Sequence, residues 1–580
     1  MSAPAGFTLV SHTLGGLPLV NHVLRRLRFD ELLHRHLPPP DPRAQLPPSA
    51  ALGVLTRNLV LARVPLYGLG EWAPAWVPAL LGLRPEQVAL LNDDRVGRAL
   101  DRLFDADPRA LLTALVVPMV KEFQVSLEQL HNDSTSLTLH GEYADATGRL
   151  VRGRPTLVVT FGHNKDHRPD LKQLLWILTV SADGAVPVHV KVADGDTEDS
   201  TTHRETWEVL RALVGSANFL YVADSKLCTR ETLKHIHEHG GRFITVLPRT
   251  RKEDALFKAW LQTHTPAWEE VARKPHPRWK DGPPDVFRAI PSPIPDADGF
   301  RLFWYESSHK LERDAQARRD AIQKAWKALE ELAVRLQGPR SRFRTQAAVA
   351  EAIEGILASA GAARWVTYQV VTGEDAVFRQ ETRGRPGQNT RWRRRLKRRF
   401  QLTWDRREAE LAYDARTDGL FPLLTNDPDL TAAALLTAYR TTQPLLETRH
   451  HLLKNVEAAT PMFLKSVSRI EAVLALHFVA LLVHALLERE VRRAMVRRGI
   501  KELPLYPEDR DCKAPSTDRI LELFAPLQRP LLCTDGRVVQ RFDPQLTELQ
   551  RKLLALLGIS AKGFMNALPQ AAEWGEKSRA

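Results

Sequence analysis

The stretch LHNDSTSLTL (130–139) has the composition of a β-strand, and the fold class is worked out from it. It also carries an acid, Asp133. An apolar or β-branched residue would pack better than a carboxylate at such a position. Other short β-rich runs follow it, separated by turn residues: RPTLVVTFG (154–162), LKQLLWILTVS (171–181), AVPVHVKV (185–192), ANFLYVAD (217–224) and RFITVLP (242–248). Helical stretches at 203–215 and 230–240 alternate with the later runs, which predicts a mixed α/β sheet.

The segments outside this block have a different texture. Residues 1–125 show apolar residues at helical spacing and many prolines, which predicts a small helical domain. A proline-rich stretch after residue 252 is followed by a predicted long helix at about 308–337, a second helix beginning after Thr345, and strands WVTYQVV and FQLTWDRREAELAY around a basic segment. After Asp418, LFPLLTN reads as a strand, and helices are expected at about 430–457 and 467–497.

The bulk composition limits the classes of function. At 580 residues and a net charge of +13, the chain is a multidomain protein whose expected partner is a polyanion, with nucleic acid first. Three scattered cysteines give neither a disulfide framework nor a zinc motif, and no signal peptide is recognised, so a cytoplasmic location is expected. The apolar stretch 470–487 carries Glu471 and two histidines; we expect a buried helix, with a membrane span as the alternative.

Two further acids occupy positions that suit chemistry. Asp224 ends the apolar run FLYVAD, at the strand edge where α/β sheets place ligand-binding groups. Glu447 lies in a predicted helix in which Gln443, Glu447 and Lys454 share one face at i, i+4 and i+11. Together with Asp133, these two acids give three carboxylates, which would suit Mg²⁺ or Mn²⁺. Two such ions can promote phosphodiester chemistry.

Five sequence blocks carry a family resemblance: NDSTSLTLHGEY (132–143), GHNKDHRPDLKQ (162–173), VADSKLCTRETL (222–233), DGLFPLLTN (418–426) and LLETRHHLLK (445–454). They resemble the successive blocks of bacterial insertion-sequence DDE transposases with a Tyr-Arg-Glu-Lys signature. The resemblance covers most of residues 10–495, and 162–173 is its most specific block. It implies an RNase H-like catalytic fold with an insertion between the second aspartate and the glutamate, which the spacing of 447 − 224 = 223 residues accommodates.

By position, the resemblance makes Asp133, Asp224 and Glu447 the catalytic, metal-binding acids, with two Mg²⁺ ions for which Mn²⁺ can substitute. It implies cleavage at element ends, attack of the freed 3′-hydroxyl on target DNA, double-stranded DNA as partner and a homodimer in the DNA complex. No membrane role is expected. The residues expected to contact DNA outside the basic segment are Lys454, Tyr439, Arg440, Arg449, His163, Lys165 and Arg168.

The resemblance also divides the chain into five parts. These are 1–125, a helical domain suited to binding element ends; 126–251, the first part of the catalytic domain; 252–415, an insertion; 416–498, the last part of the catalytic domain; and 499–580, a C-terminal helical tail.

The signature is incomplete in the glutamate helix. The expected arginine position is Gln443, and Tyr439 lies one residue early, so Arg440 or Arg449 would have to compensate. Glu471 is the rival third acid, but apolar residues follow it, whereas Arg449, two histidines and Lys454 follow Glu447.

The segment RGRPGQNTRWRRRLKRR (383–399) holds nine basic residues and no acid, which favours contact with the DNA backbone. The residues proposed for this role are Arg391, Arg393, Arg394, Arg395, Lys397, Arg398 and Arg399. Two alternatives to a transposase remain: an RNase H-like nuclease without joining activity, and an inactive DNA-binding descendant. A serine-hydrolase elbow and a Walker phosphate loop are both missing from the sequence.

Overall fold

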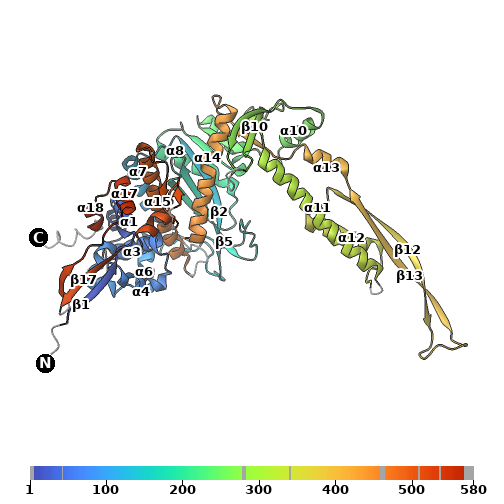
Figure 1. The fold of residues 1–580 in the computed structure, drawn as a ribbon, viewed down its shortest axis with the longest axis horizontal. Coiled ribbons are helices and arrows are strands. Elements are labelled where there is room, and N and C mark those ends of the chain that lie inside the picture. The colour runs from blue at the N-terminus through green and yellow to red at the C-terminus, as the bar shows by residue number, and fades with distance from the viewer. Residues whose placement is uncertain are drawn as a thin grey trace. The chain divides into compact units, whose positions relative to one another are not determined.

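A computed structural model describes residues 6–41, 43–276, 282–338, 341–456, 464–506, 508, 510–534 and 537–566. The chain forms two compact units (Figure 1). Unit 1 contains residues 1–245 and 437–580, and unit 2 contains residues 246–436. Each unit is described by itself.

The centre of unit 1 is a mixed sheet with strand order β6-β5-β2-β7-β8. Its strands are β2 (Gln129–Leu139), β5 (Lys172–Ser181), β6 (Pro187–Ala193), β7 (Leu220–Ala223) and β8 (Arg242–Val246). The strands β2, β5 and β6 form an antiparallel meander, while β7 and β8 run parallel to β2. This order and these directions are those of an RNase H-like sheet, so the predicted fold class is confirmed.

Burial explains why these segments are strands. Strand β5 is buried along nine of its ten residues, and β7 along its full length, as expected for strands covered on both faces. The run RPTLVVTFG was wrongly predicted as a strand: it pairs only at β4 (Arg154–Pro155), with β3 (Leu150–Val151), and at single bridges from Val158 and Thr160. Gly162 and Gly195 allow the end of this run to lie close against the sheet. A Cβ on Gly162 would lie only 2.0 Å from the carbonyl oxygen of Gly195, so a larger residue would not fit.

Helix α15 (Val467–Arg497) is the central helix of unit 1, and it packs against α1, α3, α6, α7 and β6. Of the described chain, only this helix is long and apolar enough to cross a membrane, and 94% of its apolar window is buried inside the protein. Such burial is typical of a core helix, in line with the expectation for 470–487. The other α-helices that lie wholly in unit 1 are α1 (Leu17–Arg26), α2 (Phe29–His36), α3 (Pro48–Leu61), α4 (Leu69–Trp72), α5 (Pro85–Val88), α6 (Asp93–Asp105), α7 (Pro108–Phe123), α8 (Asp199–Val214), α9 (Arg230–Glu238), α16 (Thr517–Phe524), α17 (Glu548–Leu556) and α18 (Ala561–Met565).

The N-terminal helices are joined by a buried ion pair. The guanidinium of Arg57, in α3, donates to both carboxylate oxygens of Asp30, in α2, at 3.0 and 2.8 Å. It also donates to Asn21 of α1, at 2.8 Å. Arg57 is 1% exposed, so these bonds satisfy a cation that has no access to water.

The N-terminal segment is not purely helical, contrary to the prediction. Strand β1 (Thr8–Thr13) pairs antiparallel with β17 (Gln528–Thr534), which pairs with β18 (Arg537–Arg541). Propensity alone could not identify this strand, because its partner lies more than 500 residues away. A short pair of strands, β15 (Leu503–Pro504) and β16 (Asp511–Cys512), lies in the same C-terminal region of the sequence.

Unit 2 contains an antiparallel sheet in the order β14-β11-β10-β9, with helix α10 (Lys252–Thr263) before it in sequence. Its strands are β9 (Glu269–Lys274), β10 (Asp285–Pro291), β11 (Arg301–Ser307) and β14 (Leu420–Thr425). Between β11 and β14 come α11 (Ser308–Gln337), α12 (Gln346–Ala360), β12 (Val366–Gln380), β13 (Trp392–Arg406) and α13 (Glu408–Ala415). Helices α11 and α12, the latter capped by Thr345, agree with the prediction, but EAELAY is helical and not a strand.

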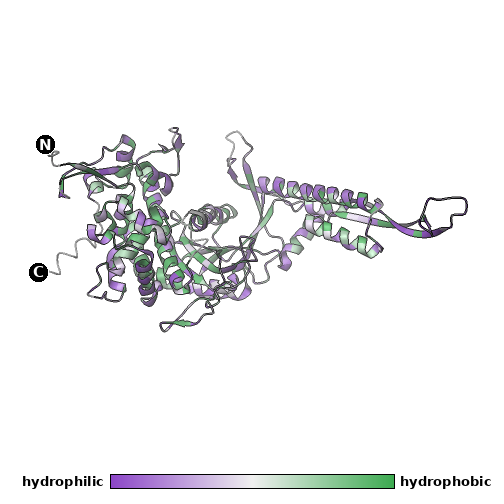
Figure 2. Cartoon of the chain, turned by 90° about the horizontal axis from the view of Figure 1, so that it is seen from below, coloured by the Kyte–Doolittle hydropathy of each residue, from purple (hydrophilic) through white to green (hydrophobic). Residues whose placement is uncertain are grey.

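Strands β12 and β13 form a long hairpin whose inner half packs on α11 and α12 (Figure 1). The shared core includes Leu329, Ile353, Val366, Phe400 and Leu402. Both helices alternate between hydrophilic and hydrophobic residues along their length, as expected for helices with one packed face (Figure 2).

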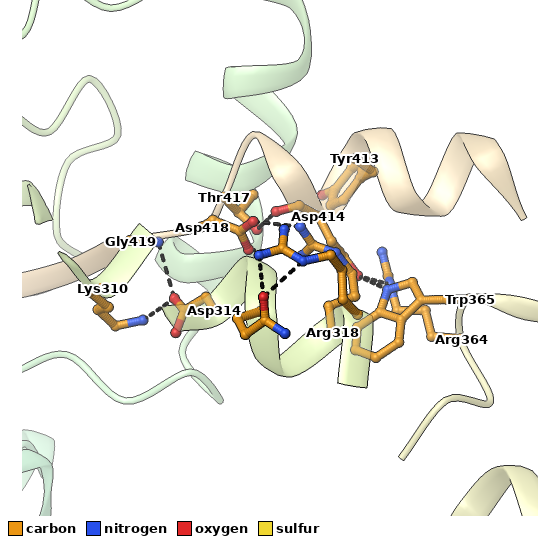
Figure 3. A network of polar contacts seen from close by, with 12 residues as sticks. Lys310, Asp314, Arg318, Arg364, Trp365, Tyr413, Asp414, Thr417, Asp418 and Gly419 are labelled. Atoms are coloured by element: carbon orange, nitrogen blue, oxygen red, sulfur yellow. Dashed lines mark hydrogen bonds and ion pairs between the residues drawn. The ribbon is translucent and has the colours of Figure 1, made fainter. Parts of the chain in front are cut away.

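A polar network fixes the base of this hairpin (Figure 3). Arg318 of α11 pairs with Asp418. Arg364 and the indole N–H of Trp365, which precede β12, both donate to Asp414 of α13, at 2.8 and 2.6 Å. The network therefore joins α11, α13 and the start of the hairpin.

Candidate active site

Asp133 and Asp224 lie side by side on neighbouring parallel strands. The register of β2 and β7 pairs Asn132 with Ala223, so the next residue on each strand is one of the two aspartates. Parallel strands are about 4.8 Å apart, and residues at the same level point to the same face. The structure thus brings the two strand acids predicted from the sequence together.

Asp133 sits in a partly buried environment that disfavours its charge. Burial raises the pKa of Asp133 to about 6; the nearby charges of Asp224 and Asp199 add to the rise, while Lys165 opposes it. The ammonium of Lys165 lies 4.0 Å from the Asp133 carboxylate and 3.0 Å from that of Asp199. Ser134 completes this cluster, because its hydroxyl donates to Asp199 at 2.7 Å.

Asp224 is held by its own backbone surroundings. Its carboxylate accepts from the backbone N–H of Lys226 at 2.9 Å and so caps the short 3₁₀ helix η4 (Ser225–Leu227). Its carbonyl accepts from the hydroxyl of Thr245, at 2.6 Å. These contacts orient the start of the loop and leave one carboxylate oxygen, Oδ2, without a hydrogen bond among the described residues.

Helix α14 (Ala432–His451) carries Tyr439 and Glu447, both within unit 1. Burial raises the pKa of Tyr439 to about 12, and the charges of Asp224, Asp133 and Glu447 raise it further. Tyr439 therefore lies in the field of all three predicted acids. The side chain of Glu447 is exposed.

Within the described residues, no group of three or more His, Cys, Asp or Glu side chains is arranged to hold a metal ion. The donor set at the strand edge consists of the two aspartates, with Asp199 nearby. Carboxylate oxygens are the ligands that Mg²⁺ prefers. A divalent cation there would offset the repulsion and burial that raise the pKa of Asp133.

Sequence reasoning missed three residues of this site. His450 approaches Asp133 with Nδ1 at 3.7 Å, and burial lowers its pKa to about 3, so the ring is neutral and the contact is not an ion pair. Its Nε2 is buried and has no hydrogen-bond partner among the described residues. His203 bonds the hydroxyl of Tyr221 at 2.9 Å and, like Asp199, belongs to α8. Only the acidic run DGDTED (194–199) was a sequence signal for this region.

Lys454 does not lie on the helix face that the sequence pattern predicts for it. Helix α14 continues as a π-helical segment, η5 (Leu452–Val456), which turns more slowly per residue than an α-helix. The expected common face of Gln443, Glu447 and Lys454 is therefore not continuous. The ammonium of Lys454 donates to both oxygens of Asp166, at 2.6 and 2.7 Å.

The two arginines considered as substitutes for the missing signature arginine differ. Arg449 is 2% exposed, pairs with Glu488 at 2.8 Å and donates to the carbonyl of Ala185. The guanidinium is enclosed in the core of unit 1, so in this structure it is not exposed for the contact with DNA that the sequence predicts. Arg440 is half-buried, and its charge lowers the pKa of Tyr439.

The specific block 162–173 forms a loop over β2. The backbone N–H of Lys165 donates to Ser136, and its ammonium donates to the carbonyl of Ser134, at 2.7 Å. Lys165 is thus engaged beside Asp133. His163 is exposed, and Arg168 is exposed and pairs with Asp170 at 2.8 Å.

The rival acid Glu471 lies at a different place in unit 1. It accepts from the backbone N–H of Leu157 at 2.9 Å and lines a pocket with Arg109, Arg154 and Trp176. Burial raises its pKa to about 7. The nearby charges that act on its pKa are those of Arg109, Asp194 and Arg154.

The basic segment runs into strand β13, in unit 2. Its predicted DNA-contacting residues there are mostly exposed; Lys397 and Arg399 are intermediate. Arg399 pairs with Asp375 on the neighbouring strand.

Comparisons with known proteins cover the chain unevenly. Residues 9–117 match the family model of a domain of unknown function, DUF4277. A search of curated proteins returns no match. Among solved structures, the chain is similar to the cryo-EM structure of a piggyBac transposase synaptic complex with hairpin DNA, at 9% sequence identity and a TM-score of 0.39, over 95% of this chain and 85% of that chain.

Proposed function

We propose that this protein is a DNA transposase of the insertion-sequence DDE type, which cleaves DNA at element ends and joins the freed 3′-hydroxyl to target DNA. One observation carries the proposal: the RNase H-like sheet places Asp133 and Asp224 at the same level of adjacent parallel strands, beside a helix that carries Tyr439 and Glu447. Paired strand carboxylates and a helix carboxylate are an oxygen-donor set for divalent cations.

In this proposal Asp133, Asp224 and Glu447 hold two Mg²⁺ ions, for which Mn²⁺ can substitute. When bound, such ions lower the pKa of an attacking hydroxyl and neutralise charge on the phosphate. The chain's own residues have separate tasks. Lys165 holds Ser134 and Asp199 in place beside Asp133, and Tyr439 closes the buried side of the site. A homodimer would process two DNA ends together.

The test is cleavage of labelled duplexes taken from the DNA on either side of the coding sequence, with Mg²⁺ or Mn²⁺. Asp133→Asn, Asp224→Asn and Glu447→Gln should each reduce cleavage by at least about 100-fold, because each removes a metal-binding charge. Two matched controls are Glu471→Gln, the rival acid, and Asp170→Asn, an exposed acid in the loop over β2; both should retain cleavage.

Further outcomes separate the alternatives. If cleaved or pre-cut ends are not joined to a target plasmid, the protein is a nuclease without joining activity. If the wild-type chain binds DNA but never cuts it, the protein is an inactive descendant. Loss of cleavage in Glu471→Gln but not in Glu447→Gln would show that the third acid is assigned incorrectly.

A further inference from the structure

The outer half of the β12–β13 hairpin, here called the ribbon, comprises residues 371–380 and 392–399. Unlike the inner half, it makes no part of the apolar core with α11 and α12, and nearly all its side chains are exposed or half-exposed. A two-stranded ribbon that projects beyond its packed base buries too little apolar surface to stabilise itself well. Its side-chain pattern must therefore be explained by something other than internal packing.

The register divides the ribbon into two chemically different faces. Val377 is opposite Arg395, Arg379 is opposite Arg393 and Asp375 is opposite Lys397, so odd-numbered residues share one face. This basic face carries Arg379, Arg393, Arg395, Lys397 and Arg399, together with Val377 and one acid, Asp375. The even-numbered, aromatic face carries Phe378, Trp392 and Leu396, each more than half exposed, with Arg394 and Arg398.

Charge is poorly compensated on the basic face. Arg379 and Arg393 are directly opposite each other, an arrangement of like charges that destabilises a strand pair. Neither of them, nor Arg395, forms an ion pair with an acid in the part of the chain that the structure describes. The one acid of this face, Asp375, pairs with Arg399 nearer the base, and on the aromatic face Arg398 stands opposite Glu374.

The two faces also differ in their surroundings. Phe400 and Leu402, which pack against the helices, have even numbers and so continue the aromatic face toward the base. The basic face is on the other side of the strands, away from that packed layer. Residues on one face of a strand recur about every 6.8 Å, so the basic face presents its cations as a row along the ribbon.

We propose that the ribbon is a duplex-DNA-binding arm that presents its basic face to the sugar–phosphate backbone. The partner follows from charge complementarity: Arg379, Arg393 and Arg395, which lack an acidic partner among the described residues, gather on one face of an exposed ribbon and fit the phosphates of a duplex. Single strands would instead favour the stacking residues of the aromatic face. The proposal rests on the proposed function only in its choice of DNA as the polyanion.

The experiment compares two double variants of the full-length chain that each remove two arginines from the same strand. Arg393→Ala/Arg395→Ala empties part of the basic face. Arg394→Ala/Arg398→Ala is the comparison on the other face: the sequence predicts that both residues contact DNA, but the register turns them away from the basic face. Binding to a random 30-base-pair duplex is measured by fluorescence anisotropy in EDTA over a range of salt concentrations, so catalysis plays no part.

The basic-face variant should bind at least about 10-fold more weakly and lower the slope of log K against log salt by about 2, while the aromatic-face variant changes binding by less than about 3-fold. Equal losses in both variants would overturn the assignment of faces, and no loss in either would overturn the ribbon as the binding arm. Tighter binding of duplex RNA or of single strands would overturn duplex DNA as the partner. Because binding is measured without a divalent cation, a failure of the proposed catalysis does not alter this result and stays distinguishable from a failure of the arm.

Discussion

Asp133 shows how burial and charge act on a single carboxyl group in opposite directions. Burial and the nearby aspartates raise its pKa, while the ammonium of Lys165 lowers it. A strand residue in such a position weakens the fold it belongs to, and this cost is typical of functional sites. The same logic, applied to other buried groups of the chain, gives predictions at the scale of single residues.

Arg57→Met should destabilise unit 1 by about 3–5 kcal/mol, because it leaves the carboxylate of Asp30 buried without its cation. The measurement is chemical denaturation monitored by tryptophan fluorescence. The matched control is Arg35→Met, which removes an exposed partner of Glu31 and should cost less than about 1 kcal/mol. Equal effects would mean that the buried pair does not stabilise the packing of α1, α2 and α3.

Glu471 should make the stability of the protein depend on pH. Burial raises its pKa in the folded protein to about 7 from 4.5, so ionisation is easier in the unfolded chain. The folded state is therefore penalised progressively as pH rises from about 4.5 to 7, by up to about 3 kcal/mol. Glu471→Gln removes this penalty, so the variant should gain stability over the wild type across this range.

Denaturation at a series of pH values between 4 and 8 measures the effect. Glu502→Gln, at an exposed position, is the control and should follow the wild type at every pH. A constant difference between Glu471→Gln and the wild type would contradict the raised pKa.

At the scale of elements, the β12–β13 hairpin combines two environments in one strand. Its inner half is part of a core with α11 and α12, and its outer half is exposed. The polar network around Asp414 and Asp418 attaches its base to α11 and α13 (Figure 3). The fold of the hairpin should thus depend on the inner half alone.

Leu402→Ala should destabilise unit 2 by about 2–5 kcal/mol, because Leu402 is 7% exposed within that core. Leu396→Ala, on the same strand and the same face but 56% exposed, should change the stability by less than about 0.5 kcal/mol. Thermal unfolding followed by circular dichroism compares the two. Similar losses would show that the outer half is also packed in solution.

At the scale of the whole molecule, one unit is inserted in the sequence of the other. Unit 2 is a continuous segment, 246–436, whereas unit 1 is assembled from the residues before and after it. Each has its own apolar core. Two separate cores predict two unfolding transitions.

Scanning calorimetry should resolve these two transitions, and the variants assign them. Arg57→Met should lower the temperature of one transition, and Leu402→Ala that of the other. If each variant shifted both transitions equally, the two units would unfold as one cooperative block.

Much of the fold could be predicted from patterns in the sequence, and the limits have physical reasons. The strands of the sheet and helices α11, α12 and α15 have strong periodicity, so they were found. Strand β1 was missed because its stability comes from pairing with β17, far along the chain. The run EAELAY continued a strand prediction past its end, although helix α13 begins there.

The residues of the candidate site could be predicted where a single strand or a single run of sequence shows that they are unusual. Asp133 and Asp224 stand out on their own strands. The contacts of His450 and Asp199 with the Asp133 cluster depend on tertiary packing, which no local pattern records. The position of Lys454 depends on a π-helical turn, and a calculation that assumes ideal α-helical spacing cannot anticipate it.

The split organisation of unit 1 also has a consequence during synthesis on the ribosome. Asp133 and Asp224 are made well before Glu447, which follows Asp224 after 447 − 224 = 223 residues. At about 5–20 residues per second, this delay is roughly 10 to 45 s. Strand β17, the partner of β1, emerges later still. A nascent chain therefore has its proposed DNA-binding ribbon before it has the third of its proposed metal-binding acids, so binding would become possible before cutting does.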